Sequence, residues 1–439
     1  MKKIVASVGL VAVGAAGLQA ADLSALTTEG GKPWTTSATL RGFYDDNYNT
    51  YPNNATLPPG GHRSTFGFEV SPDVEFNFPM EQTTLSFGYT YSYKYFMNRP
   101  LYQTGNDANT HDFHAALNHA FSERYSVNVR DSFVIGQEPD FLRAGNSFTT
   151  FQRISGNNLR NYGAIDFDAQ LTPQFGLELG YANTFTSYAN NSWSQNPDGT
   201  ITPSNSGLLD MLDHLIHLDG RYQLQPQTIG VVGVSFRETD YTGHQPIGIY
   251  EDGSSVMSGD RDARSYYGYV GLDHNFRPDL TGSIRVGGRY TDYYNDPVNQ
   301  NQGSPYLMAS LKYTYMPESY LQIGGSYDYI PSALGPSPNG SDEINTSAQA
   351  GTVFAAVTHR IMPKLYGSVQ AQYQNSTYYG GLYDGKDANY YLLGLNMKYQ
   401  FTPNFSSEIG YNYDNFSSGV PGQGHYDRNR IYIGITGSY

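Results

Sequence analysis

The sequence predicts an all-β chain that forms a transmembrane, antiparallel, up-and-down β-barrel, and three observations lead to this fold class. Polar and apolar residues alternate along more than a dozen runs of about ten residues or longer, the length of a membrane-spanning strand. Tyrosines gather at one end of the apolar face of these runs. Short turns that contain proline alternate with long polar loops. The composition agrees with this fold, because the 439 residues include 40 tyrosines and 48 glycines but no cysteine.

The alternation of period two is clear in residues 84–95, 280–290 and 391–401. A soluble sandwich would turn the polar face of such strands to solvent, whereas a membrane barrel turns the apolar face to lipid and the polar face to its lumen. Strand length and the terminal tyrosines favour the barrel, because tyrosine is preferred where membrane meets water. These tyrosines are Tyr93, Tyr95, Tyr290, Tyr327, Tyr329, Tyr373 and Tyr413.

The N-terminus has the pattern of a cleavable signal peptide. Lys2 and Lys3 precede an apolar run over residues 4–18, and small residues follow around Ala20. The run is shorter than the roughly 20 residues of a membrane-spanning helix, so a retained anchor is the less favoured alternative. We expect a signal peptide over 1–20, a short periplasmic segment over 21–33 and the barrel over 34–439.

One turn pattern recurs along the chain and gives the strand count. The stretch YQFTPNFS over 399–406 places a proline between two large apolar residues, and similar turns lie near 78, 121, 171, 224, 276, 315 and 361. Proline suits the first central position of a tight turn. Eight such turns join strands two to seventeen in pairs, and the first and last strands make eighteen. Both chain ends then lie on the turn side, which is the periplasmic side.

Pro72 complicates this count, because residues 70–74 match the turn pattern only a few residues before Pro79. The apolar register of residues 66–78 continues through Pro72. We therefore expect the turn at 79–82 and a strand defect at Pro72, such as a β-bulge. If Pro72 formed the turn instead, a sixteen-stranded barrel would be the alternative.

The chain's last strand carries a resemblance. Residues 430–439 alternate apolar residues on one face and end in Tyr439, which resembles the terminal strand of outer-membrane porins that the barrel-assembly machinery recognises. The opening strand over 38–48 is similar to the start of the putative beta-barrel porin 2 family. This resemblance implies a Gram-negative outer-membrane protein with no catalytic role and no cofactor, in contact with lipid, the assembly machinery and small solutes. A homotrimer is an arrangement that it allows.

The resemblance implies passive diffusion of small hydrophilic solutes through a water-filled lumen. One alternative is a substrate-specific channel, for example for sugars, and another is a structural or adhesive barrel without transport. A sugar channel would use aromatic rings on the inner wall and in the loops: Phe43, Tyr267, Tyr269, Tyr432, Trp193, Tyr378, Tyr379 and Tyr383. The formal charge of −14 argues against a nucleic-acid partner, since phosphate binding requires basic surfaces.

The predicted register turns charged residues of both signs toward the lumen, where we expect them either to bias permeating ions or to pair and stabilise the wall. The basic residues of this set are Arg41, Lys94, Arg130, Arg221, Arg285, Arg289, Lys312, Lys398 and Arg430. The acidic residues are Glu69, Asp73, Glu75, Asp166, Asp168, Glu178, Asp219, Asp273 and Glu408. Histidine pairs such as His111 and His114 face opposite sides of a strand, so no metal site is expected.

The long loops complete the predictions. The loop over 137–161 is the third long loop, and we expect it either to fold into the lumen as a constriction or to remain exposed; its charged residues are Glu138, Asp140, Arg143, Arg153 and Arg160. The longest loop, over 238–264, is expected to be solvated and acidic. Acidic residues of the outer loops predict a weak preference for cations: Asp45, Asp46, Asp292, Asp296, Asp342 and Glu343.

Overall fold

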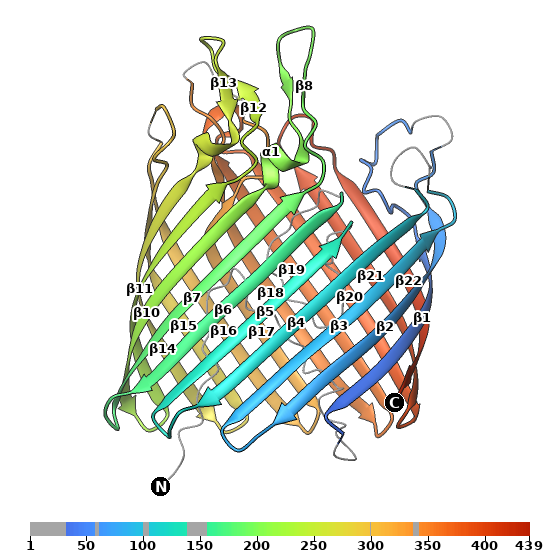
Figure 1. The fold of residues 1–439 in the computed structure, drawn as a ribbon, viewed down its shortest axis with the longest axis vertical. Helices are drawn as coiled ribbons and strands as arrows, with labels where there is room; N and C mark the ends of the chain where they lie inside the picture. The colour runs from blue at the N-terminus through green and yellow to red at the C-terminus, as the bar shows by residue number, and fades with distance from the viewer. Residues whose placement is uncertain (1–31, 58–60, 100–104, 138–155, 299, 337–341) are drawn as a thin grey trace.

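A computed structural model describes residues 32–57, 61–99, 105–137, 156–298, 300–336 and 342–439. Tilted strands form a cylinder, with short turns at one end and long loops at the other (Figure 1). Within these ranges, none of the helices combines the length and the apolar character needed to cross a membrane. The predicted signal peptide over 1–20 lies outside the described residues.

The first half of the wall consists of consecutive antiparallel neighbours. These strands are β1 (Trp34–Asp45), β2 (Thr65–Pro79), β3 (Thr83–Phe96), β4 (Asp107–Ala120), β5 (Tyr125–Gly136), β6 (Asn158–Gln170), β7 (Phe175–Tyr188), β10 (Met211–Gln225) and β11 (Thr228–Tyr241). The second half continues the same pattern with β14 (Ala263–Arg277), β15 (Leu280–Asp292), β16 (Gln302–Met316), β17 (Ser319–Pro331), β18 (Ser347–Met362), β19 (Leu365–Tyr379), β20 (Asp387–Thr402), β21 (Phe405–Ser418) and β22 (Tyr426–Ser438).

The sheet closes on itself through its first and last strands. β1 pairs antiparallel with β22, from Ser37 opposite Ser438 to Asp45 opposite Arg430. All 18 strands therefore belong to one sheet with no open edge. This confirms the predicted barrel and its strand number, and it excludes the sixteen-stranded alternative.

The recurring proline pattern forms the short turns as predicted. Between β20 and β21, Gln400 pairs with Ser406 and Thr402 pairs with Phe405, so the register shifts by one residue at Phe401. This shift keeps Phe401 and Phe405 on the outer face, where their ring centroids are 5.6 Å apart. The same shift accompanies the turns that follow β10, β14 and β18.

Pro72 lies inside β2, and the predicted bulge is wrong. Val70 pairs with Tyr93 and Asp73 with Thr90 on β3, which is the same register on either side of the proline. On the other side Pro72 lies opposite Ala38 of β1. Because proline has no N–H, the ladder toward β3 is interrupted there without any inserted residue.

The outer face is apolar and the inner face is polar, as the alternation predicts. The most exposed apolar side chains of the strands point outward, including Val232 at 66% and Ile433 at 64% exposure. Tyr329 departs from the prediction, because it is buried and packs with Ala263 and Tyr293 rather than lying in the outer ring of tyrosines. The strand β17 ends two residues later, at Pro331.

The long-loop end carries its own small structure. It includes the hairpins β8 (Ser194–Gln195) with β9 (Ile201–Thr202) and β12 (Pro246–Ile249) with β13 (Ser255–Met257), the helix α1 (Asn205–Leu209), and the turns η2 (Ser258–Arg261) and η3 (Gly381–Tyr383). Ile247, Val256 and Ile344 form a buried cluster here. Arg261 is fully buried, so the expectation that the loop over 238–264 is simply solvated is wrong.

Candidate functional site: the inner wall of the barrel

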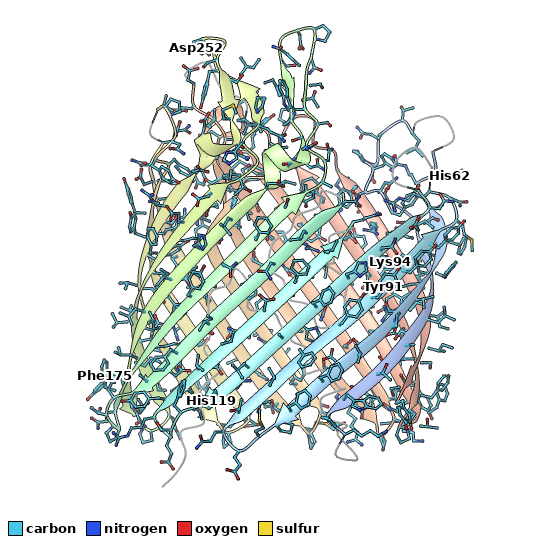
Figure 2. All side chains as sticks on the ribbon, viewed as in Figure 1. His62, Tyr91, Lys94, His119, Phe175 and Asp252 are labelled. Atoms are coloured by element: carbon cyan, nitrogen blue, oxygen red, sulfur yellow. The ribbon has the colours of Figure 1, made fainter. Side chains whose placement is uncertain are left out.

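The inner wall is lined by residues from every second position of the strands. Figure 2 shows the side chains around the whole cylinder, with Phe175 and His119 near the short turns and Asp252 at the top of the loops. On β3, Tyr91 points outward and Lys94 inward, because residues three apart in a strand face opposite sides.

A network of four charges extends along the wall from β7 to β15 and passes across β11. The Nη1 atom of Arg221 on β10 lies 2.5 Å from Oε2 of Glu178 on β7, and its Nη2 atom lies 3.2 Å from Oδ2 of Asp273 on β14. Arg285 on β15 donates to both oxygens of Asp273, at 2.8 and 3.1 Å. Such charge-assisted pairs hold their side chains in fixed positions along the wall.

Gly233 makes room for a second bridge across the same strands. The Tyr269 hydroxyl on β14 donates to Oδ1 of Asp219 on β10 over a distance of 2.6 Å. The two side chains meet above β11, where a Cβ atom on Gly233 would lie 2.1 Å from Oδ1 of Asp219. Only glycine fits beneath this contact. The glycine at position 233 of β11 therefore allows Tyr269 and Asp219 to form their hydrogen bond.

Charged side chains also form ion pairs across the junction between β1 and β22. The Nε atom of Arg41 lies 2.5 Å from Oε1 of Glu408, and its Nη1 atom lies 3.5 Å from Oε1 of Glu69. Nearer the loops, Asp45 is fully buried and accepts from Arg428 at 2.6 Å and from Arg430 at 3.2 Å. Asp45 was predicted to be an exposed acidic loop residue, and this is wrong because β1 extends to include it.

Most remaining members of the predicted set also have partners on the wall. Arg130 pairs with Asp166 at 2.9 Å, His114 with Glu75 at 2.9 Å, and Arg289 with Asp328 at 3.6 Å. Thr90 donates to Asp73 at 2.7 Å and Asn128 to Asp168 at 3.3 Å.

Two lysines of the wall differ from these residues in their lack of an ion pair among the described residues. In the part of the chain that the structure describes, neither Lys312 on β16 nor Lys398 on β20 forms an ion pair, and Lys312 lies over the Tyr320 ring at 5.5 Å. Both are near the short-turn ends of their strands. Within the described residues, Lys312 and Lys398 are therefore basic residues of the set without an acidic partner.

The predicted constriction loop lies largely outside the described residues, which exclude Glu138, Asp140, Arg143 and Arg153. Arg160 is described, but it belongs to β6 and not to a loop. The loop between β5 and β6 is thus shorter than the predicted 137–161.

The acidic outer-loop residues are less available than predicted. Asp296 is buried and accepts from the backbone N–H groups of Val298 and Gln300 at 3.2 and 2.9 Å. Asp46 accepts from Asn429, and Asp342 from the N–H of Glu251 at 2.8 Å. Asp292 is the last residue of β15 rather than a loop residue.

The aromatic residues proposed for sugar stacking are mostly occupied by contacts within the protein. Phe43 is buried edge-on against Phe96, and Tyr267 is buried edge-on against Tyr306. Tyr432 accepts from Asn396 at 2.9 Å. Tyr378 and Tyr379 end β19, and Tyr383 lies in η3, whereas Trp193 before β8 is exposed.

The structure adds wall residues that the sequence reasoning missed. Arg237 on β11 donates to both oxygens of Asp213 on β10, at 2.8 and 3.0 Å. His217 lies 3.6 Å from Oε1 of Glu178. The alternation could have found Arg237, because Val234 and Phe236 face outward beside it. Among the described residues, no group of three or more potential ligands could hold a metal ion.

Comparisons with known proteins identify one family and several solved structures of low sequence identity. The family model described as "Putative beta-barrel porin 2" matches residues 194–439. No curated protein matches the chain. Similar solved structures include OccAB4 of Acinetobacter baumannii, with 12% identity, a TM-score of 0.44, and coverage of 93% of this chain and 99% of that chain. The outer membrane protein opdK of Pseudomonas aeruginosa has 11% identity, a TM-score of 0.44, and coverage of 92% and 99%.

Proposed function

This chain belongs to the putative beta-barrel porin 2 family and forms an outer-membrane channel; from that premise, we propose that small hydrophilic solutes diffuse passively along its charged inner wall. The observation that carries this proposal is the ring of inward-facing charges of both signs inside a closed barrel. Such groups are costly in lipid but are solvated by water in a lumen. Fixed charges along the path then bias which ions pass.

We propose a weak preference for cations. The predicted wall set has as many acidic as basic residues, so the bias comes from the net charge of −14 carried by the whole chain. The burial of Asp45 and Asp296 reduces the contribution of the outer loops, which is consistent with a weak preference and not a strong one.

The decisive experiment is conductance of the purified, refolded barrel in a planar lipid bilayer with a salt gradient. We expect discrete conductance steps and a reversal potential whose sign indicates selectivity for cations. A reversal potential of the opposite sign would refute the cation preference. A folded barrel with no conductance would refute the channel proposal and favour a structural or adhesive role.

A sugar-specific channel is the less favoured proposal, because the rings of Phe43 and Tyr267 are buried. Block of the conductance by oligosaccharides that saturates with concentration would reverse this ranking.

The remaining parts of the proposal concern export and assembly. We propose that residues 1–20 direct export and are removed after Ala20, that both mature termini lie in the periplasm, and that the strand ending in Tyr439 is recognised by the barrel-assembly machinery. The start of β1 and the end of β22 lie at the short-turn end, which supports this side for the termini (Figure 1). Mass measurement of the mature chain and protease accessibility in intact cells test the first two statements. Deletion of Tyr439 tests the third, with loss of assembly expected.

A further inference from the structure

Three carboxylates lie side by side on the inner wall and form a carboxylate row. Asp168 on β6 is opposite Glu178 on β7, and Glu178 is opposite Asp219 on β10; these strands are neighbours on one wall (Figure 1). All three face the lumen, because an exposed apolar residue of the outer face lies next to each of them along its strand. Opposite side chains have Cβ atoms about 4.5–5.5 Å apart, and like charges at such positions are destabilising. A cation between the members would relieve this repulsion.

The two outer members of the carboxylate row have no basic partner. In the part of the chain that the structure describes, neither Asp168 nor Asp219 forms an ion pair. Neutral groups donate to them instead, the Asn128 amide to Asp168 at 3.3 Å and the Tyr269 hydroxyl to Asp219 at 2.6 Å. Arg221 binds the middle member of the row. The negative charges at both ends of the row are therefore left without a cation from the wall.

A fourth carboxylate beside the row lacks a hydrogen-bond donor. Asp166 lies two residues from Asp168 on the same face of β6 and is 5% exposed. Its Oδ2 atom pairs with Arg130 at 2.9 Å, whereas its Oδ1 atom is buried and accepts no hydrogen bond from any described residue. Gly180 lies between Asp166 and His217 in the register, so no side chain fills the wall at that point. A buried oxygen without a donor is costly, which indicates a place for one.

Carboxylates outnumber arginines in this part of the wall. The arginines that pair with them are Arg130, Arg221 and Arg285, and the carboxylates are Asp166, Asp168, Glu178, Asp219 and Asp273. His217, whose Nε2 atom lies 3.6 Å from Glu178, adds a positive charge only when it is protonated. A local surplus of negative charge raises the concentration of cations next to it. This part of the wall is therefore suited to a cationic solute.

From these observations we infer that the carboxylate row binds the ammonium groups of organic cations that enter the lumen. An ammonium group offers three N–H donors and no acceptor, so it contacts two carboxylates at once. Arg221 shows this arrangement within the protein, because its guanidinium bridges Glu178 and Asp273 on different strands at 2.5 and 3.2 Å. The outer members of the row are two strand spacings, about 10 Å, apart, so a linear diamine reaches both. The inference rests on the proposed channel function, because the cation must first enter the lumen.

Block of the potassium conductance of the purified full-length barrel by hexamethylenediamine, a linear diamine, tests the site. We expect the conductance to fall and the block to saturate with diamine concentration. In Asp168→Asn/Asp219→Asn the concentration for half block should rise at least about tenfold, because amides keep the shape of the carboxylates without their charge. Asp73→Asn/Glu75→Gln is the matched control, since it removes the same charge from the inner wall on β2. An equal rise in both double variants would overturn the inference.

Hexamethonium separates hydrogen bonding from charge, because methyl groups replace every N–H of the same diamine. The wild-type barrel should bind the diamine more tightly than hexamethonium, and Asp168→Asn/Asp219→Asn should lose this difference, which a mere effect of size would preserve. The wild-type comparison stands even where the variant fails to fold. Normal conductance without block by the diamine, or equal block by the two compounds, would overturn the inference and leave the channel proposal intact. A folded barrel without any conductance would refute the channel proposal itself.

Discussion

Asp262 shows how burial changes the chemistry of a single residue in the loop cluster. It precedes β14 and accepts from the backbone N–H of Tyr241 at 2.7 Å and from Nδ2 of Asn295 at 3.0 Å. Burial raises the pKa of the Asp262 carboxyl to about 6, and the nearby Asp240 acts in the same direction. The folded loops therefore hold this proton more tightly than an unfolded chain, in which an aspartate has a pKa of about 3.9.

The sign of the pH dependence follows from this difference. Between roughly pH 4 and pH 6 the folded state binds more protons than the unfolded state, so the contribution of Asp262 to loop stability falls as pH rises through that window. We predict that Asp262→Asn resists protease cleavage in the loops better than wild type at pH 7 and equally well at pH 5. Comparing the two proteins at the same pH removes the protease's own pH dependence. Equal cleavage at both pH values would contradict the prediction.

Lys398 tests whether permeating ions pass close to the inner wall. It lies opposite Glu408 in the β20–β21 register without forming an ion pair in the described residues. We predict that Lys398→Glu raises the cation-to-anion permeability ratio by on the order of twofold, because a wall charge acts on ions within a screening length of about 8 Å. Lys364→Glu is the control, since Lys364 lies in a turn and donates to the Phe401 carbonyl at 2.9 Å. The reversal potential measures both, and an equal shift in the two variants would mean that the wall position does not matter.

At the scale of elements, Arg261 ties several loops together. Its guanidinium donates to the carbonyls of Ser332 at 3.1 Å, Gly207 at 3.2 Å and Leu208 at 2.9 Å, and it lies 4.0 Å from the centroid of the Tyr241 ring. These contacts connect η2, the end of β17, α1 and β11. One buried side chain thus fixes the positions of four elements at the long-loop end.

We predict that Arg261→Ala destabilises the loop cluster by about 1–3 kcal/mol, because buried carbonyl oxygens lose their donors. Hydrogen exchange of the amides in β12 and β13 should become faster, while exchange in the barrel strands should not change. Arg277→Ala provides the control, as Arg277 is exposed beside a short turn. Unchanged exchange in the loops of Arg261→Ala would show that other contacts hold them.

The strands and loops also differ in how far the sequence could predict them. Strand number and register followed from alternation and proline turns, because membrane strands must present one face to lipid and one to water. The loop cluster did not follow, because Arg261 binds carbonyls of segments far apart in the sequence. Pro72 was placed correctly in a strand, but its effect on the ladder depends on β3, which no local pattern reveals.

For the molecule as a whole, closure depends on a junction between the two ends of the chain. The first and last strands meet along β1 and β22, and every other pair of neighbouring strands is joined by a turn or loop. Side-chain contacts reinforce this junction at two levels: Arg41 with Glu408 toward the middle and Asp45 with Arg428 near the loops. Because this junction alone closes the sheet between the two ends of the chain, we expect it to limit the stability of the closed barrel.

We therefore predict that Asp45→Ala lowers the unfolding temperature of the whole barrel. Removing one partner of a buried ion pair costs about 3–5 kcal/mol, and Asp45 is fully buried between Arg428 and Arg430. The temperature at which the folded barrel converts to the unfolded form on a detergent gel measures this change. Asp198→Ala, in the exposed turn between β8 and β9, should leave that temperature unchanged. An unchanged unfolding temperature of Asp45→Ala would contradict this prediction. The ion pairs of Asp45 would then not limit the stability of the closed barrel, and the backbone hydrogen bonds between β1 and β22 would hold the junction.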